Sequence, residues 1–158
     1  MSDIIEMVST VTDGLSITCK DIRVRPSGSN VSKGQICYIG SDGESTTIAA
    51  ATPANALQRR TGIIGVALSN IPANTYGFVR ISGPCLAKVK STAGGSLTVD
   101  ARLSVGTAGA FDMDASEVDA NRYQAYAAET GTMVATVAQL KLVVLMGPNG
   151  LGISGGSA

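Results

Sequence analysis

The pattern that most resembles a catalytic motif runs from Gly152 to Gly156 and matches G-x-S-x-G around Ser154. In hydrolases this motif holds a nucleophilic serine on a turn between a strand and a helix, and it needs histidine and acidic partners. The sequence contains no histidine, and the match lies inside a Gly/Ser-rich segment at 147–158. We therefore interpret it as a chance match and predict no serine nucleophile.

The three cysteines, Cys19, Cys37 and Cys85, are the other candidate nucleophiles. The absence of histidine excludes a Cys-His pair and the common zinc sites. The number of cysteines is odd, their spacing is wide, and no CxxC motif occurs. We predict reduced, mostly buried structural thiols in a protein made in a cytosol.

An acidic stretch at 112–122 holds the candidate cation ligands. Asp112 and Asp114 have the spacing of the first two ligands of a calcium-binding loop. The sixth position of such a loop requires glycine and the twelfth requires glutamate, but this sequence has Glu117 and Tyr123 there. At most a weak cation site at Asp112 and Asp114 is expected, and a solvated acidic loop is the alternative. A carboxylate-based hydrolase would need a pocket that gathers at least two of these acids.

Charge and aromatic content argue against several binding functions. The chain has 12 basic and 12 acidic residues and no net charge, whereas nucleic-acid-binding proteins show a basic excess. The basic pairs are Arg23 with Arg25, Arg59 with Arg60, and Lys88 with Lys90. We interpret these pairs as solvated faces or links to a partner rather than phosphate sites. Aromatic residues make up 4% of the chain, too few for platforms that stack on sugars or single strands.

Further motifs for cofactors and targeting are missing from the sequence. No glycine-rich phosphate loop is present, so the main signal of nucleotide-dependent enzymes is absent. The N-terminal residues lack the basic and apolar regions of a signal peptide, and no apolar run reaches the length of a membrane span. We predict no enzyme activity and no cofactor, and neither nucleic acid nor membrane is an expected partner.

The elements that would position these residues are predicted to be strands. Small and β-branched residues, separated by turns rich in glycine, indicate an all-β protein. The expected strands include 15–25, 35–39, 63–68, 76–82, 85–90, 97–99, 102–105, 133–137 and 140–146. The apolar residues change sides within 15–25, which requires a bulge near Lys20 and Asp21. Gly83-Pro84 is expected to break the strand at 76–82.

The same patterns predict one short helix and three regions. Thr52 and Pro53 are suited to the first positions of a helix that would cover 54–60. The strands are expected to form a small antiparallel barrel or sandwich at 15–147. An N-terminal arm or first strand at 1–14 precedes it, and a flexible Gly/Ser-rich tail at 148–158 follows.

Two segments of the sequence echo each other. TGIIGVALSNIPANTYGFVRISGP at 61–84 and YQAYAAETGTMVATVAQLKLVVLMGP at 123–148 both contain a small-residue strand and a polar loop. Each then continues into a strand that ends in Gly-Pro. The pattern leaves open whether the chain contains an internal duplication.

Several segments together resemble small head proteins of tailed bacteriophages. VSKGQICYIG at 31–40 is similar to an opening strand of these proteins, and TGIIGVALSNIPANTYGFVRISGPCLAKV at 61–89 is similar to their repeated segment. KLVVLMGP at 141–148 is similar to their terminal strand. The resemblance covers roughly residues 31–147, and the chain departs from the simplest members by a longer middle.

The family so indicated is that of head-decoration, or cement, proteins that stabilise the capsid. The resemblance implies a tulip-like β fold and a virion location on the outer capsid surface, after synthesis in the host cytoplasm. It also implies two partners, the major capsid protein and further copies of the chain in a trimer or dimer. The apolar residues Ile4, Ile5, Met7 and Val8 would then add a strand to a capsid or neighbouring sheet. The alternatives are a virion fibre or receptor- or carbohydrate-binding module, and a minor tail or connector protein.

Overall fold

The described part of the chain consists of strands and contains no helix, which confirms the all-β prediction. The computed structural model describes residues 4–10, 16–26, 28–41, 46–50, 64–106, 109–113 and 125–146. The strands are β1 (Ile4–Thr10), β2 (Ser16–Pro26), β3 (Ile36–Ser41), β4 (Thr46–Ala50), β5 (Ile64–Ala67), β6 (Gly77–Lys90), β7 (Gly95–Leu97), β8 (Arg102–Val105), β9 (Phe111–Asp112), β10 (Ala125–Ala127), β11 (Gly131–Met133) and β12 (Gln139–Leu145). The helix predicted at 54–60 and the tail predicted at 148–158 lie outside the described residues.

Five strands close into a first small barrel. Around this ring β2 pairs with β4, β4 with β3, β3 with β5, β5 with β6, and β6 returns to β2. The β2–β4 contact is parallel and the other four are antiparallel, so the barrel is mixed rather than purely antiparallel as predicted. The bulge expected near Lys20 and Asp21 is confirmed as a register shift between these two residues where β2 pairs with β6.

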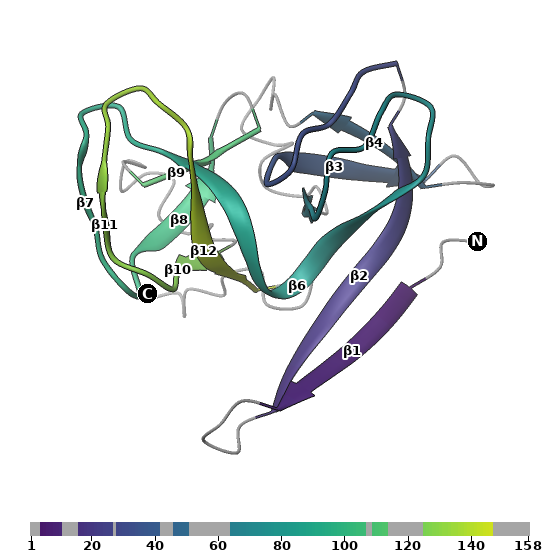
Figure 1. Cartoon of the computed structure of the whole chain (residues 1–158), viewed down its shortest axis with the longest axis horizontal. Helices are drawn as coiled ribbons and strands as arrows, with labels where there is room; N and C mark the ends of the chain where they lie inside the picture. Colours follow the sequence, from purple (N-terminus) through teal and green to yellow (C-terminus); the bar gives the residue numbers. More distant parts are fainter. Residues whose placement is uncertain are drawn as a thin grey trace, which may run out of the picture.

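Five strands also close into a second barrel, and β6 belongs to both. Here β6 pairs with β12, β12 with β10, β10 with β8, β8 with β9, and β9 returns to β6. The β6–β9 contact is parallel and the others are antiparallel, as at the corresponding places of the first ring. Figure 1 shows the two rings as two lobes, with β6 crossing from one to the other.

Strand β6 changes partners at Gly83 and Pro84. Residues 77–82 pair with β2, whereas residues 83–89 pair with β12. Our prediction that Gly83-Pro84 breaks the strand is therefore wrong, because β6 runs through this dipeptide without interruption. Gly83 has a φ of 98°, which only glycine adopts without strain. The dipeptide thus bends one continuous strand from the first barrel into the second.

The buried residues form two adjoining cores. Ile22, Val24, Val79 and Ile81 belong to the core of the first barrel, and Val89, Leu103, Phe111 and Val143 to that of the second. Strands β3 and β5 contribute to both cores through consecutive residues. In β5, Val66 packs in the second core and Ala67 in the first. These strands therefore form a wall between the barrels, which accounts for the continuous apolar run predicted as a buried strand at 63–68.

Matching turns also repeat between the two barrels. Gly34, just before β3 of the first barrel, has a φ of 77°, and Asp100, just before β8 of the second barrel, has a φ of 65°. The Gly34 amide donates a hydrogen bond to the Ala67 carbonyl at 2.8 Å, and the Asp100 amide donates one to the Ala127 carbonyl at 2.9 Å. Within the two segments that echo each other in sequence, β5 and β6 thus correspond to β10 and β12 in two copies of one strand arrangement.

A second turn repeats in the same way. Asn74 and Thr136 have φ angles of 61° and 63°. The Asn74 amide donates to the Pro26 carbonyl at 2.9 Å, and the Thr136 amide donates to the Ser91 carbonyl at 2.8 Å. The turn at Thr136 also corrects the predicted strand at 133–137, because β11 ends at Met133 and the residues that follow are exposed.

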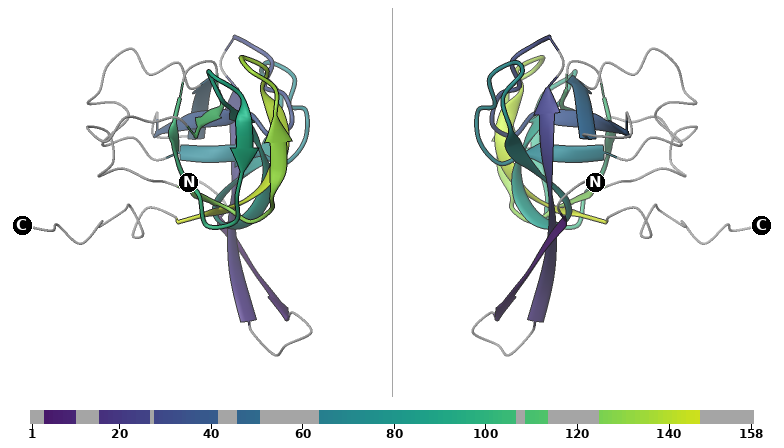
Figure 2. Two further views of the ribbon diagram at one scale, coloured as in Figure 1. Left: turned by 90° about the vertical axis from the view of Figure 1, so that its left-hand side faces the viewer. Right: turned by 90° about the vertical axis from the view of Figure 1, so that its right-hand side faces the viewer.

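Strand β1 lies outside both rings. It pairs antiparallel with β2 from Ile4 opposite Ile22 to Thr10 opposite Ser16. Figure 2 shows that this antiparallel pair projects away from the barrels in both views. We call it the β1–β2 arm, meaning residues 4–10 of β1 and 16–19 of β2. No helix in the described part of the chain is long and apolar enough to span a membrane.

The conformation of Gly83 predicts a specific effect of Gly83→Ala. A side chain at a buried position with positive φ should lower the free energy of unfolding by about 1–3 kcal/mol. Urea unfolding of the purified variant measures this loss. Ser82→Ala, one residue earlier in β6, is the matched control and should change stability by less than about 0.5 kcal/mol. Equal effects of the two substitutions would show that the bend places no special demand on Gly83.

Candidate functional site

The cysteines lie in protected positions rather than in a reactive cleft. Cys19, Cys37 and Cys85 are all free and buried, which confirms the prediction of buried, unpaired thiols. Burial raises the pKa of Cys37 and of Cys85 to about 12. Both groups are therefore protonated at neutral pH, and a protonated thiol is a poor nucleophile.

The proposed cation ligands are only partly within the described structure. Asp112 is half-buried in the short strand β9, and Asp114 lies outside the described residues. Within the described ranges, no three Cys, Asp or Glu side chains gather as a metal site would require. The weak cation site at Asp112 and Asp114 remains a prediction. Ser154, of the G-x-S-x-G match, is also outside the described residues.

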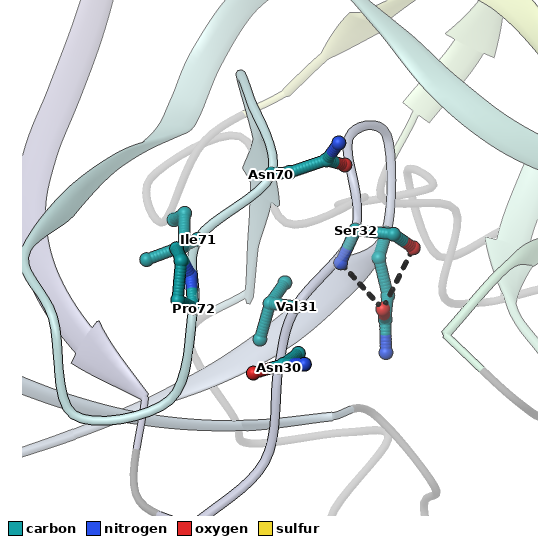
Figure 3. Close-up of a pocket in the computed structure, with 7 residues that line it drawn as sticks. Asn30, Val31, Ser32, Asn70, Ile71 and Pro72 are labelled. Atoms are coloured by element: carbon teal, nitrogen blue, oxygen red, sulfur yellow. Dashed lines mark hydrogen bonds between the residues drawn. The ribbon is translucent and has the colours of Figure 1, made fainter.

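A shallow cleft of about 310 Å³ opens at one end of the first barrel. Two loops line it, one before β3 and one between β5 and β6, through the residues Asn30, Val31, Ser32, Gln35, Asn70, Ile71 and Pro72. Figure 3 shows the two loops side by side, with Val31 and Ile71 between the two asparagines. The cleft is the natural place to look for a ligand site.

The polar groups of this cleft hold the two loops together. Val31 and Ile71 exchange two backbone hydrogen bonds of 2.9 and 2.8 Å. The Asn30 Oδ1 accepts from the Ala73 amide at 2.8 Å, and the Asn70 Oδ1 accepts from the Lys33 amide at 2.9 Å. Each asparagine therefore fixes the opposite loop. This reciprocal clasp gives the cleft a structural role.

Ser32 is the hydroxyl at the cleft, and its neighbours do not activate it. Its Oγ donates to Gln35 Oε1 at 3.1 Å and accepts from Lys88 Nζ at 2.6 Å. A general base must take the proton of the nucleophile, and a neutral amide oxygen such as Gln35 Oε1 does not. The Ser32 amide also donates to Gln35 Oε1, at 3.0 Å, so this contact shapes the loop.

A partly buried ion pair lies where the two barrels join, with Asp21 buried and Arg80 half-buried. Arg80 in β6 contacts Asp21 in β2 through two hydrogen bonds, Nε to Oδ1 at 2.7 Å and Nη2 to Oδ2 at 3.1 Å. The third nitrogen of its guanidinium, Nη1, donates a hydrogen bond of 2.6 Å to the Pro84 carbonyl, across the bend of β6. The hydrogen bond with Asp21 raises the pKa of Arg80 despite its partial burial. The guanidinium therefore fixes the first barrel to the start of the second.

The basic pairs are engaged in contacts within the chain. The Arg23 guanidinium lies 4.9 Å from the centre of the Tyr76 ring, and Arg25 Nε donates to the Asn74 carbonyl at 3.0 Å. Lys88 donates to Ser32. These contacts support strand faces rather than a phosphate site, as the sequence indicated. Arg59 and Arg60 lie outside the described residues.

Sequence reasoning missed two features of the surface. The clasp repeats a short motif, Ser-Asn-Val at 29–31 and Ser-Asn-Ile at 69–71, which was a usable signal. The outer face of β6 and β12 is apolar, because Leu86 and Leu142 lie opposite each other and are 41% and 36% exposed. Leu86 shares this face of β6 with Lys88 and Lys90, and β12 adds the exposed aliphatic side chains of Leu140 and Val144 to it.

The four predicted arm residues lie together in β1. Ile4, Ile5, Met7 and Val8 pair with Ile22, Asp21, Cys19 and Thr18 of β2. Their backbone therefore forms an ordinary antiparallel ladder on one edge of β1. Their role in binding a capsid or neighbouring sheet stays a prediction.

Comparison with known proteins shows a likeness in fold to a solved structure. No protein-family model matches the sequence, and no curated protein is significantly similar to it. The chain is similar to a solved structure, the head fiber gp8.5 N base of bacteriophage phi29, with a TM-score of 0.52 and 16% sequence identity. The match covers 79% of this chain and 92% of that chain. At this level of identity, the likeness shows that the two proteins share a fold.

The buried thiols predict how stability depends on alkaline pH. Unfolding returns Cys37 and Cys85 to a pKa near 9, so the unfolded state loses these protons before the folded state does. The free energy of unfolding should therefore be insensitive to these thiols below pH 8 and should fall between pH 9 and 12. The slope is up to about 1.4 kcal/mol per pH unit for each thiol.

Denaturant unfolding at several pH values, on the wild type and on the double variant Cys37→Ala/Cys85→Ala, isolates this contribution. The double variant should show a clearly smaller decline above pH 9, whatever its stability at pH 7. Parallel declines in the two proteins would contradict the assignment of buried, protonated thiols.

Proposed function

We propose that this chain is a structural protein of a tailed-phage head and that it forms the base of a fibre on the outer capsid surface. The observation that carries the proposal is the fold likeness, which extends over 92% of a head fibre base. The resemblance of residues 31–147 to phage head proteins, drawn from strand and glycine placement, supports the same assignment.

The chemistry of the described residues fits a role in attachment. The thiols are buried, Ser32 has no base, and the asparagines of the cleft bind the opposite loop. A fibre base needs a rigid body that withstands force, and two closed barrels supply one because closure leaves no ring strand with a free edge. The polar groups of the cleft thus stabilise the fold by holding its loops together.

A cement function is the nearest alternative and shares the same location. A cement protein would bridge capsid subunits and strengthen the shell, whereas a fibre base would attach an appendage without that requirement. We favour the fibre base because the similar structure is one. The partners in either case are the major capsid protein and further copies of this chain, and several weak contacts per oligomer would combine into tight attachment.

Binding to purified heads tests this proposal. Full-length protein is mixed with expanded phage heads that lack it, and bound copies are counted and located by electron microscopy. We expect saturable binding at regular positions on the outer surface. Binding at a single vertex, or no binding, would contradict a role on the head surface.

The thermal stability of the same heads separates the two versions of the proposal. Heads carrying a fibre base should disrupt at the same temperature as bare heads, whereas heads carrying a cement protein should disrupt at a higher one. A raised disruption temperature would therefore contradict the fibre-base assignment and support a cement function. Serum albumin, added at the same concentration, controls for nonspecific protection.

A further inference from the structure

The two loops that line the cleft take the places of strands β7 and β11 in the second barrel, because each is followed by the matching turn. β7 and β11 pair over three residues, so their backbone groups bond to one another. The two loops of the first barrel are instead joined by one backbone bridge, between Val31 and Ile71. The side-chain clasp supplements this bridge and leaves the cleft of about 310 Å³ open.

The clasp uses the side-chain oxygens of two asparagines and leaves their nitrogens. Asn30 Oδ1 and Asn70 Oδ1 each accept a hydrogen bond from a backbone amide of the opposite loop. Within the described part of the chain, neither Nδ2 group donates to a protein acceptor. Figure 3 shows the two asparagines at opposite ends of the cleft. Each end of the cleft therefore offers N–H donors to a ligand.

Lys88 brings a positive charge to one end of the cleft. Its amide donates to the Gly34 carbonyl at 2.7 Å, and its Nζ donates to Ser32 Oγ at 2.6 Å. Asn70 lies at the same end, because its Oδ1 binds the amide of Lys33, the residue after Ser32. An ammonium group has three N–H donors, so Lys88 can still donate to a ligand.

The charge at this end of the cleft is not balanced by the described residues. None of the seven residues that line the cleft is acidic, and Lys88 forms no ion pair with a described residue. Water can satisfy the donors in the free protein, so a ligand gains affinity where it supplies a negative charge as well as an acceptor. A carboxylate has both properties and donates no hydrogen bond when ionised.

We propose that the cleft binds the carboxylate of an acidic side chain in a peptide, through Lys88 Nζ and Asn70 Nδ2. The rest of the peptide lies along the cleft, and Asn30 Nδ2 at the other end donates to one of its carbonyl oxygens. The volume of about 310 Å³ is at the lower end of the range for small-ligand sites. The proposal assigns a ligand site and does not rest on the phage-head assignment.

A sugar acid carries the same carboxylate but fits the cleft less well. Sugar rings are commonly bound by stacking on aromatic side chains, and the seven lining residues include no aromatic one. Inorganic phosphate also differs, because at neutral pH it carries more negative charge than the single ammonium of Lys88 balances. The acidic peptide therefore fits the cleft best, and the other two anions serve as comparisons.

Titration of the full-length, nitrogen-15-labelled protein with two matched probes tests the site. The probes are the N-acetyl N-methylamides of glutamate and of glutamine, which differ in a carboxylate and a neutral amide, used at constant ionic strength. The glutamate probe should shift the side-chain amide signals of Asn70 and Asn30 and saturate with a Kd on the order of 1 mM. The glutamine probe should bind at least about tenfold more weakly, because it makes no charge-assisted hydrogen bond.

Three variants identify the groups that bind the glutamate probe. Lys88→Met removes the charge and should weaken binding about tenfold or more. Lys90→Met removes a charge from the same face of β6 and, as the matched control, should weaken binding less than about twofold. Asn70→Asp keeps an oxygen for the Lys33 amide but replaces the donor, so it should abolish binding while near-ultraviolet circular dichroism shows an intact fold.

Four outcomes would overturn the proposal. The first is equal affinity for the two probes, or no saturable shift with either. The second is equal weakening by Lys88→Met and Lys90→Met, which would indicate a general positive field instead of a site. The third is full binding by Asn70→Asp. The fourth is tighter binding of glucuronate or inorganic phosphate than of the glutamate probe, which would assign the cleft to another anion. None of these results bears on whether the protein binds phage heads.

Discussion

The structure depends on the passage of β6 from one barrel to the other. A single backbone must complete two closed rings, so it has to leave β2 and reach β12 without losing its ladder of hydrogen bonds. Gly83 allows the bend because it tolerates a φ of 98°, and Arg80 spans the bend by binding Asp21 on one side and the Pro84 carbonyl on the other. Removal of either partner would leave the other ionic group partly buried without its hydrogen bonds, so the junction constrains the stability of the fold as well as its geometry.

The two barrels share β6 because they repeat the same order of strands. Each ring starts with a long strand, makes one parallel contact, and ends with the strand that lies beside the first. In the first ring that last strand continues as the first strand of the second. Sharing β6 joins the two cores, and the double-sided strands β3 and β5 seal the wall between them. Among the described residues, the buried thiols and the bonded asparagines of the cleft are occupied in holding the fold together, which fits the structural role that we propose.

Local patterns predicted much of this fold, and long-range pairing supplied the rest. The alternation of apolar residues located most strands, and the change of sides in 15–25 located the bulge at Lys20 and Asp21. Gly83-Pro84 predicts a strand end because glycine followed by proline normally ends a strand, but β6 continues here since residues 83–89 pair with β12 of the second barrel. The parallel contacts join residues distant in sequence, and no local pattern reports them. At the cleft, the repeated Ser-Asn motif was a signal that sequence reasoning missed, and the reciprocal bonds of the clasp join residues 37 and 43 positions apart in the chain.

Hydrogen exchange along β6 tests most directly whether the shared strand makes the two barrels one folding unit. The slowest amides before Gly83 and the slowest after Pro84 should exchange with the same opening free energy, equal to that of global unfolding. That result would show that neither barrel opens while the other stays closed. A clear difference between the two halves of β6 would contradict the account, because it would mean that each barrel holds its part of the strand independently.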